Sequence, residues 1–357
     1  MRSSLAVHFG ASCRSRTSKI TQSPATLKGV AGLLISIAIN LVYNHSMKFG
    51  IRNTSFVYPD GTGNIWEDTK SHIQRAERDG FDSFWVMDHF YQLPAHGAVE
   101  EPFLDAWTVL PALAAATSRI RLGAMVSPVG YRNPALLARM AASLDHISGG
   151  RMNFGFGAGG FKPEYKAYGF DFIEKPSIRI AQMKEALQLI LGLWTDPCFT
   201  FRGKYFQVED AILEPKPLQK PHPPILIGGV GPKLIMRVIA ELGDACNLWG
   251  PPEETARERD ILKKHCEDVG RDESTIEKTT YDLVICAPTE AALKQKIERF
   301  LPKGVEPWMA LVGTPAQLLD TVGEYERVGA DHLCMDFAGN DIESYVFFVE
   351  EVMGKYR

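Results

Sequence analysis

The sequence lacks several features that would assign it to common functional classes. Its formal net charge is only -4, so no basic field is present to attract nucleic acid. No two cysteines form a CxxC pair, and their spacing suits neither a zinc site nor a disulfide framework; the six are at positions 13, 198, 246, 266, 286 and 334. No low-complexity tract is present either. We therefore expect a soluble globular protein with reduced thiols, a cytoplasmic location and no bound metal.

Long hydrophobic runs are also missing. The most apolar stretch, residues 30–43, is mostly hydrophobic but shorter than the ~20 residues that span a membrane. Before it, residues 1–29 are basic, rich in Ser and Thr, and contain no acidic residue. Residues 1–46 allow three interpretations: a disordered leader or a start codon assigned too early, an export or anchor signal, or an ordered extra helix. We favour the first and expect no stable membrane association.

From residue 47 onward, short apolar runs alternate with helical patterns. The first two runs are KFGI and DSFWVM, and the last is ADHLCMDFAG. The segments between the runs have apolar residues at helical spacing. Eight such repeats predict a (β/α)₈ TIM barrel over residues 47–357. A doubly wound sheet is the alternative, but no GxGxxG follows the first run.

One segment, residues 198–224, interrupts this alternation before the fifth strand. FTFRGKYFQV predicts a β-hairpin about a glycine turn, and a proline-rich irregular stretch follows it. Long insertions in barrels often build the active-site face, and we expect the same of this one.

Polar residues and glycines follow the predicted strands, where barrels carry their chemistry. Asp88 and His89 end the second strand; either His89 is an acid/base group oriented by Asp88, or the two form a structural pair that caps the loop. Ser127 and Pro128 end the third strand and indicate a bulge that includes a cis bond, or an ordinary turn.

Two glycine-rich loops follow the fourth and fifth strands. GFGAGG supplies Gly157, Ala158 and Gly159, with Glu164 and Tyr168 further along the loop; the second loop supplies Gly228, Gly229 and Gly231 ahead of a helix, with Lys233 adding charge. The GK[ST] ending of a Walker A loop is absent. A glycine turn before a helix favours phosphate binding, so the two loops together predict a flat, phosphorylated cofactor across the barrel mouth. The Trp and Met residues at helical spacing, by contrast, are predicted to be core residues: Trp107, Trp194, Trp308, Met140 and Met183.

The segment RIRLGAMVSPVGYRNPALLARMAASLDHISGGRMNFGFGAGG closely resembles the luciferase-like flavin and deazaflavin superfamily. Further matches are GFDSFWVMDHF, EYKAYGF, FRGKYFQVEDAILEPKPLQKPHPPILIGGVG and GTPAQLLDTVGEYERVGADHL. The resemblance runs from residue 47 to the C-terminus. It implies a homodimeric barrel that binds coenzyme F420 or, alternatively, FMN.

The resemblance also implies roles for the residues singled out above. Asp88 and His89 match the pair of the deazaflavin branch, and the bulge that backs the cofactor ring maps to residues 126–129, which include Val126, Ser127 and Pro128. The two glycine loops would contact the ribityl chain and the phosphate. Gly160 stands where the branch's sugar-phosphate dehydrogenases have a carboxylate, so sugar-phosphate oxidation is not expected.

The function that the resemblance implies is F420-dependent hydride transfer to or from a small organic substrate. His89 would move the matching proton, Asp88 would hold the imidazole, and Glu164 would be a second acid/base residue. One alternative is an FMN-dependent monooxygenase supplied by a flavin or F420 reductase. Another is a non-catalytic flavin-binding barrel, against which the Asp88–His89 pair and both glycine loops argue.

Overall fold

In the computed structural model, the structure describes residues 47–229, 231–302 and 304–356. The predicted leader, residues 1–46 with its apolar stretch, lies outside the described residues. Among the described residues, no helix is long and apolar enough to cross a membrane. The five cysteines described there are unpaired; Cys198 is exposed and the other four are buried.

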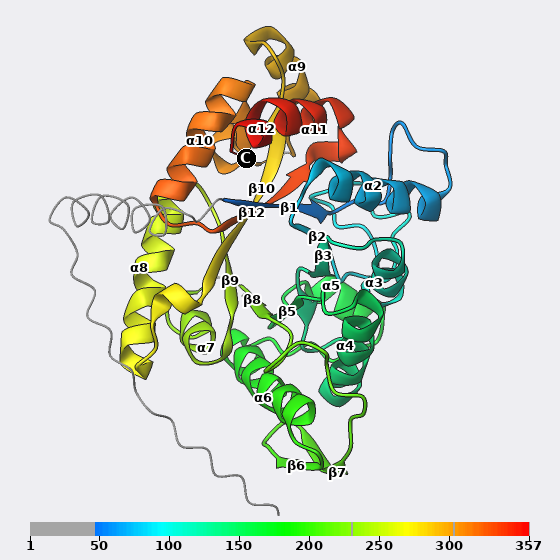
Figure 1. Cartoon of the computed structure of the whole chain (residues 1–357), viewed down its shortest axis with the longest axis vertical. Helices are drawn as coiled ribbons and strands as arrows, with labels where there is room; N and C mark the ends of the chain where they lie inside the picture. Colours follow the sequence, from blue (N-terminus) through cyan, green and yellow to red (C-terminus); the bar gives the residue numbers. More distant parts are fainter. Residues whose placement is uncertain (1–46, 230, 303, 357) are drawn as a thin grey trace, which may run out of the picture. The chain divides into compact units, whose positions relative to one another are not determined.

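A ring of parallel strands forms the centre of the fold (Figure 1). The strands are β1 (Lys48–Asn53), β2 (Ser83–Val86), β3 (Arg121–Ala124), β4 (Ser127–Pro128), β5 (Phe154–Gly157), β8 (Ile225–Gly228), β9 (Ala245–Leu248), β10 (Glu277–Cys286) and β12 (His332–Phe337). They are hydrogen-bonded in the order β3-β2-β1-β12-β10-β9-β8-β5-β4. Because β3 and β4 are two parts of one strand, and Leu122 of β3 also bridges to Met152, the ring closes as an eight-stranded barrel.

Helices surround the barrel, as Figure 1 shows. They are α2 (Ile65–Asp79), α3 (Ala106–Ala115), α4 (Pro134–Ser148), α6 (Pro176–Thr195), α7 (Ile235–Leu242), α8 (Pro252–Val269), α10 (Pro315–Arg327) and α11 (Ile342–Phe348). Further elements are α5 (Lys162–Ala167), α9 (Glu290–Phe300), β11 (Leu311–Gly313), which pairs with β10, and α12 (Gly354–Tyr356). The predicted (β/α)₈ barrel is confirmed, and the doubly wound alternative is wrong.

Side chains alternate between two cores along each strand. Trp85 packs inside the barrel with Met125, Leu226, Ala245 and Cys334. Its neighbours Phe84 and Val86 belong instead to the large core between strands and helices. This two-residue period decides which residues beyond the end of β2 face the barrel mouth and which face the helices.

The insertion before the fifth barrel strand contains the predicted hairpin, β6 (Phe199–Arg202) and β7 (Gln207–Ala211), which pair in antiparallel register. Its expected place over the active-site face is wrong. The segment follows helix α6 and leads into β8, so it lies at the amino ends of the strands. There Gln219 accepts from Arg121, the first residue of β3, and donates to the carbonyl of Met152 just before β5.

Candidate active site

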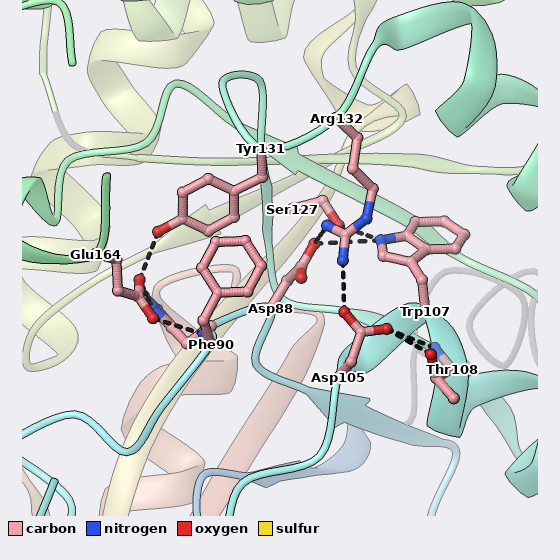
Figure 2. Close-up of polar contacts among 10 residues, drawn as sticks. Asp88, Phe90, Asp105, Trp107, Thr108, Ser127, Tyr131, Arg132 and Glu164 are labelled. Atoms are coloured by element: carbon pink, nitrogen blue, oxygen red, sulfur yellow. Dashed lines mark hydrogen bonds and ion pairs between the residues drawn. The ribbon is translucent and has the colours of Figure 1, made fainter. Parts of the chain in front are cut away.

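His89 is held by a buried carboxylate that lies 75 residues away in the sequence. Its Nδ1 is 2.7 Å from Oε2 of Glu164, which is fully buried at the start of the short helix α5. The same Oε2 accepts from the Tyr131 hydroxyl at 2.5 Å, and Oε1 accepts from the Phe90 backbone N–H at 2.6 Å (Figure 2). Three donors therefore fix the carboxylate, and the carboxylate fixes the imidazole.

The electrostatics of this group favour an ionised Glu164. Burial alone would raise its pKa, but the hydrogen bonds and charge of His89, with the bonds from Tyr131 and Phe90, lower the pKa below its usual value. An ionised carboxylate can only accept, so Nδ1 of His89 carries the hydrogen. Nε2 of His89 has no hydrogen-bond partner among the residues that the structure describes, and the side chain is 20% exposed. This leaves Nε2 available to a ligand.

Asp88 has a different set of partners, so its predicted pairing with His89 is wrong. Its Oδ2 accepts from Arg132 at 2.7 Å and from the Trp107 indole at 3.2 Å. Arg132 also bonds Asp105, the residue that caps α3 (Figure 2). The physical reason is the alternation along β2: Asp88 follows the outward positions 84 and 86 toward α3, whereas His89 follows inward-facing Trp85.

Burial raises the pKa of Asp88, and the charge of Arg132 opposes that rise. Its second oxygen, Oδ1, is buried without a hydrogen-bond partner among the described residues. The core prediction is confirmed for Trp107, Trp194 and Met183, and Met140 packs partly buried against the core, but it is wrong for Trp308, which is 65% exposed. The sequence did not indicate the N–H contacts of Trp107 with Asp88 and with Ser127 Oγ at 2.8 Å. A catalytic role for Asp88 remains a prediction.

The third barrel strand is interrupted, as the sequence predicted, between β3 and β4. The cis bond joins Met125 to Val126; Ser127–Pro128 is not among the cis bonds. Ser127 and Pro128 are buried, and the Ser127 hydroxyl is occupied by Trp107, so its side chain is directed away from the mouth. Val126 is partly buried against the barrel-interior cluster and forms part of the floor of the mouth.

The first glycine loop, and Gly228 at the start of the second, are shaped by contacts with neighbouring side chains. A Cβ on Gly157 would lie 2.7 Å from Val126 Cγ2, and one on Gly228 would lie 2.8 Å from Val126 Cγ1. Gly159 has a φ of +68°, and a Cβ there would meet the Tyr165 hydroxyl at 2.3 Å. Ala158 is half-buried beside it. The packing of Val126 thus explains Gly157 and Gly228 without a ligand.

The second glycine loop has open space. Gly229 and Gly231 have φ values of +136° and +141°, and a Cβ on Gly231 would meet no atom within 4 Å. Lys233 is exposed, and helix α7 begins at Ile235 with no side-chain cap. Free N–H groups at such a helix start suit a phosphate. The chain's residues therefore fit the predicted group here, and phosphate binding stays a prediction.

Two further groups near the mouth consist mainly of residues that were not singled out from the sequence; Tyr168 is the exception. Asp336, at the end of β12, accepts from Thr54 at 2.8 Å and lies 3.3 Å from Nδ1 of His96. An aromatic cluster surrounds His89 and Glu164: Phe90 packs at 4.5 Å from the rings of both Tyr131 and Tyr168. Tyr131, Arg132 and Asp336 all end or follow barrel strands, and that position was the available signal.

The comparisons with known proteins agree with this architecture. A glucose-6-phosphate dehydrogenase of Amycolatopsis mediterranei (strain U-32), described as F420-dependent, is 29% identical and covers 81% of this chain and 94% of its own length. An FMNH₂-dependent dimethylsulfone monooxygenase of Pseudomonas putida is 35% identical, but over only 44% of this chain and 41% of its own.

Among solved structures, an F420-dependent secondary alcohol dehydrogenase in complex with an F420–acetone adduct superposes with a TM-score of 0.73. It covers 87% of this chain and 99% of its own at 22% identity, and this similarity shows the fold. The model of the luciferase-like monooxygenase family matches residues 47–308. The chain belongs to the luciferase-like monooxygenase family.

Proposed function

We propose that this protein is an F420-dependent oxidoreductase that transfers a hydride between the deazaflavin and an alcohol or carbonyl carbon of a small organic substrate. The observation that carries the proposal is the Glu164–His89 pair, which leaves Nε2 of the imidazole available. The F420-dependent relative that covers most of the chain supports the choice of cofactor.

The residues predicted to hold the cofactor are those that line the barrel mouth. Val126, with the main chain of Ser127 and Pro128, would back the ring. The glycine loops, Gly157–Gly159 and Gly228–Gly231, would accommodate the ribityl chain and phosphate; the open space at Gly231 supports this for the second loop. When bound, F420 accepts or supplies the hydride.

The chain's own residues would handle the proton. In the oxidation direction, Nε2 of His89 takes the proton of the substrate hydroxyl while the hydride leaves the carbon that bears it. The resulting imidazolium keeps its Nδ1–H bond to the Glu164 carboxylate, and the opposite charges stabilise each other. In the reduction direction, the imidazolium returns the proton to the carbonyl oxygen. Tyr131 and Phe90 keep the carboxylate in place throughout.

The first test measures binding of F420 and of FMN to the full-length chain by fluorescence quenching. Micromolar or tighter F420 binding, with much weaker FMN binding, would support the proposal. A screen of alcohols and ketones would follow, with His89→Gln as the control that retains cofactor binding and loses turnover. Binding to neither cofactor would refute the proposal.

The second candidate function is an FMN-dependent monooxygenase with a reductase partner. The dimethylsulfone monooxygenase relative favours it. Preference for FMN, with oxygen consumption when FMNH₂ and a substrate are supplied, would establish this candidate. Homodimeric assembly and a cytoplasmic location remain parts of the proposal; light scattering of the purified protein tests the first.

A further inference from the structure

We infer that Arg52 is the residue that binds an anionic or electron-rich group of a ligand in the barrel mouth. The inference deepens the proposed function and rests on it for the identity of the cofactor. Neither the strand-end residues nor the glycine loops discussed above include Arg52.

The position of Arg52 places its side chain inside the barrel. On β1 it is in register with Trp85 of β2, which belongs to the barrel-interior cluster. Its guanidinium lies 4.4 Å from the ring centroid of Tyr281, which packs against the same cluster. Its Nη2 lies 3.3 Å from Sδ of Met87, beyond the carboxyl end of β2. The side chain therefore extends from β1 toward the mouth.

The opposite end of the barrel is closed to this side chain. There the Trp85 indole donates to Ser83 Oγ at 2.7 Å, and Ser83 Oγ is 2.9 Å from Nε2 of His332. His332 in turn bonds Glu277 at 2.7 Å. This network fills the interior below Trp85, so a ligand would reach Arg52 from the mouth of the barrel.

The contacts of Arg52 leave most of its N–H donors unsatisfied. A guanidinium has five N–H donors and matches carboxylate and phosphate groups in pairs of bonds. Within the described ranges, Arg52 has one sulfur contact and one aromatic contact, and it forms no ion pair. It is only half-buried. A cation in such a site attracts negative charge more strongly than one in open water.

Arg132 and Arg121 differ from Arg52 in this respect. Arg132 is paired with Asp88 and Asp105. Arg121, at the opposite end of the barrel, bonds Asn153, Gln219 and main-chain carbonyls. These contacts explain both side chains as structural, whereas the contacts of Arg52 do not satisfy its donors.

Two sources could supply the group that Arg52 binds. One is the cofactor ring, whose pyrimidine edge carries carbonyl oxygens and becomes more negative when the ring is reduced. The other is a carboxylate or phosphate of the substrate. The experiment therefore has one arm for each source, and it compares full-length wild type with Arg52→Met, Arg52→Lys and Arg202→Met. Arg202 is the matched control, because it is 73% exposed on the β6–β7 hairpin.

The first arm measures the Kd of oxidised and reduced F420 and FMN by fluorescence and absorbance titration. If the cofactor ring is the partner, Arg52→Met weakens reduced-cofactor binding tenfold more than oxidised-cofactor binding. That ratio equals a drop of about 30 mV in the two-electron potential of the bound cofactor. Arg52→Lys should be intermediate, and Arg202→Met should match wild type.

The second arm measures the rise in Tm caused by sodium sulfate relative to sodium chloride at equal ionic strength. Sulfate also stabilises every variant by exclusion from the protein surface, so the site-specific effect is the difference between variants. If a substrate anion is the partner, the cofactor constants stay equal, and the sulfate-specific rise is smaller in Arg52→Met than in wild type and Arg202→Met. If neither arm separates Arg52→Met from Arg202→Met, the inference is wrong. Failure of wild type to bind either cofactor refutes the proposed function, and the sulfate arm still decides the role of Arg52.

Discussion

Replacing Glu164 with glutamine should reverse the hydrogen position on His89. The carboxylate accepts on both oxygens: Oε2 from His89 and Tyr131, Oε1 from the Phe90 N–H. Glutamine has one acceptor oxygen. To keep the main-chain bond at Phe90, the amide must direct its NH₂ group toward His89 and Tyr131. The Tyr131 hydroxyl can rotate to accept, but Nδ1 of His89 can accept only if its hydrogen moves to Nε2.

The magnitude follows from the loss of the base. With Nε2 protonated in the resting enzyme, His89 cannot take the substrate proton, and general base catalysis contributes roughly 10²–10⁴ in rate. We expect alcohol oxidation by Glu164→Gln to fall at least ~100-fold. Losing one charge-assisted hydrogen bond should also lower the free energy of unfolding by roughly 1.5–3 kcal/mol.

Side-chain ¹⁵N NMR of histidine-labelled protein reads this change without a substrate. The chain has nine histidines, so the His89 signals are assigned by difference from His89→Gln. Wild type should show hydrogen on Nδ1, and Glu164→Gln should show it on Nε2. Tyr131→Phe is the control that keeps the carboxylate and should keep the wild-type tautomer. The same tautomer in wild type and Glu164→Gln would refute the reasoning.

The pH dependence of stability has a defined sign for this group. The pKa of Glu164 is lowered in the folded protein from an ordinary value of 4.5, because the bonds and charge described above outweigh burial. A lowered carboxyl pKa adds stability above about pH 4.5, and the contribution is lost as the pH falls toward the folded pKa. The unfolding free energy of Glu164→Gln should therefore fall less steeply than wild type over that acid range.

Three further predictions concern other buried groups. Arg132→Met should lower the free energy of unfolding by roughly 3–5 kcal/mol, because it leaves Asp88 unpaired, and adding Asp88→Asn should recover part of that loss in urea denaturation. A double variant no more stable than Arg132→Met would contradict the ion-pair argument. Burial raises the pKa of Asp282 from 3.8 to about 6, so wild type should lose about 3 kcal/mol as the pH rises through that window, and Asp282→Asn should not. Superimposable Tm–pH curves for wild type and Asp282→Asn would show that burial does not raise the pKa of Asp282 in the folded protein. Gly157→Ala should weaken cofactor binding at least ~10-fold by displacing Val126, and adding Val126→Ala, which removes the clash, should recover part of that loss.

The fold could be predicted because its signals are local and repeated. Apolar runs, helical spacing and end signals such as Gly80, which ends α2 in the left-handed conformation, each act over a few residues. The place of the insertion was missed although connectivity alone determines it: a segment that follows a helix enters the next strand at its amino end. The break in the third strand was predicted from Ser127 and Pro128, whereas the cis bond is at Met125–Val126.

The site was less predictable because neighbours in sequence are not neighbours in function. Adjacent Asp88 and His89 suggested a pair, but successive residues at a strand end face opposite sides, and the sheet separates them. The partner of His89 comes from a helix after the fourth strand, a contact that no local pattern specifies. Glu164 was named as a catalytic residue from its loop, but its role in orienting His89 follows only from the closed barrel.

The glycine motif was located correctly from the sequence, but the structure gives a different reason for two of its glycines. Gly157 and Gly228 lack a side chain because Val126, from another strand, fills the space that a Cβ would need. A ligand approaching the main chain would impose the same requirement, so the sequence cannot distinguish the two causes. The two causes act together if Val126 supports the cofactor ring. The glycines then determine where the Val126 side chain lies, and Val126 determines where the ring lies. Loss of binding in Gly157→Ala with recovery in the double variant would separate this indirect action from direct contact, because a direct contact would not be restored by shortening Val126.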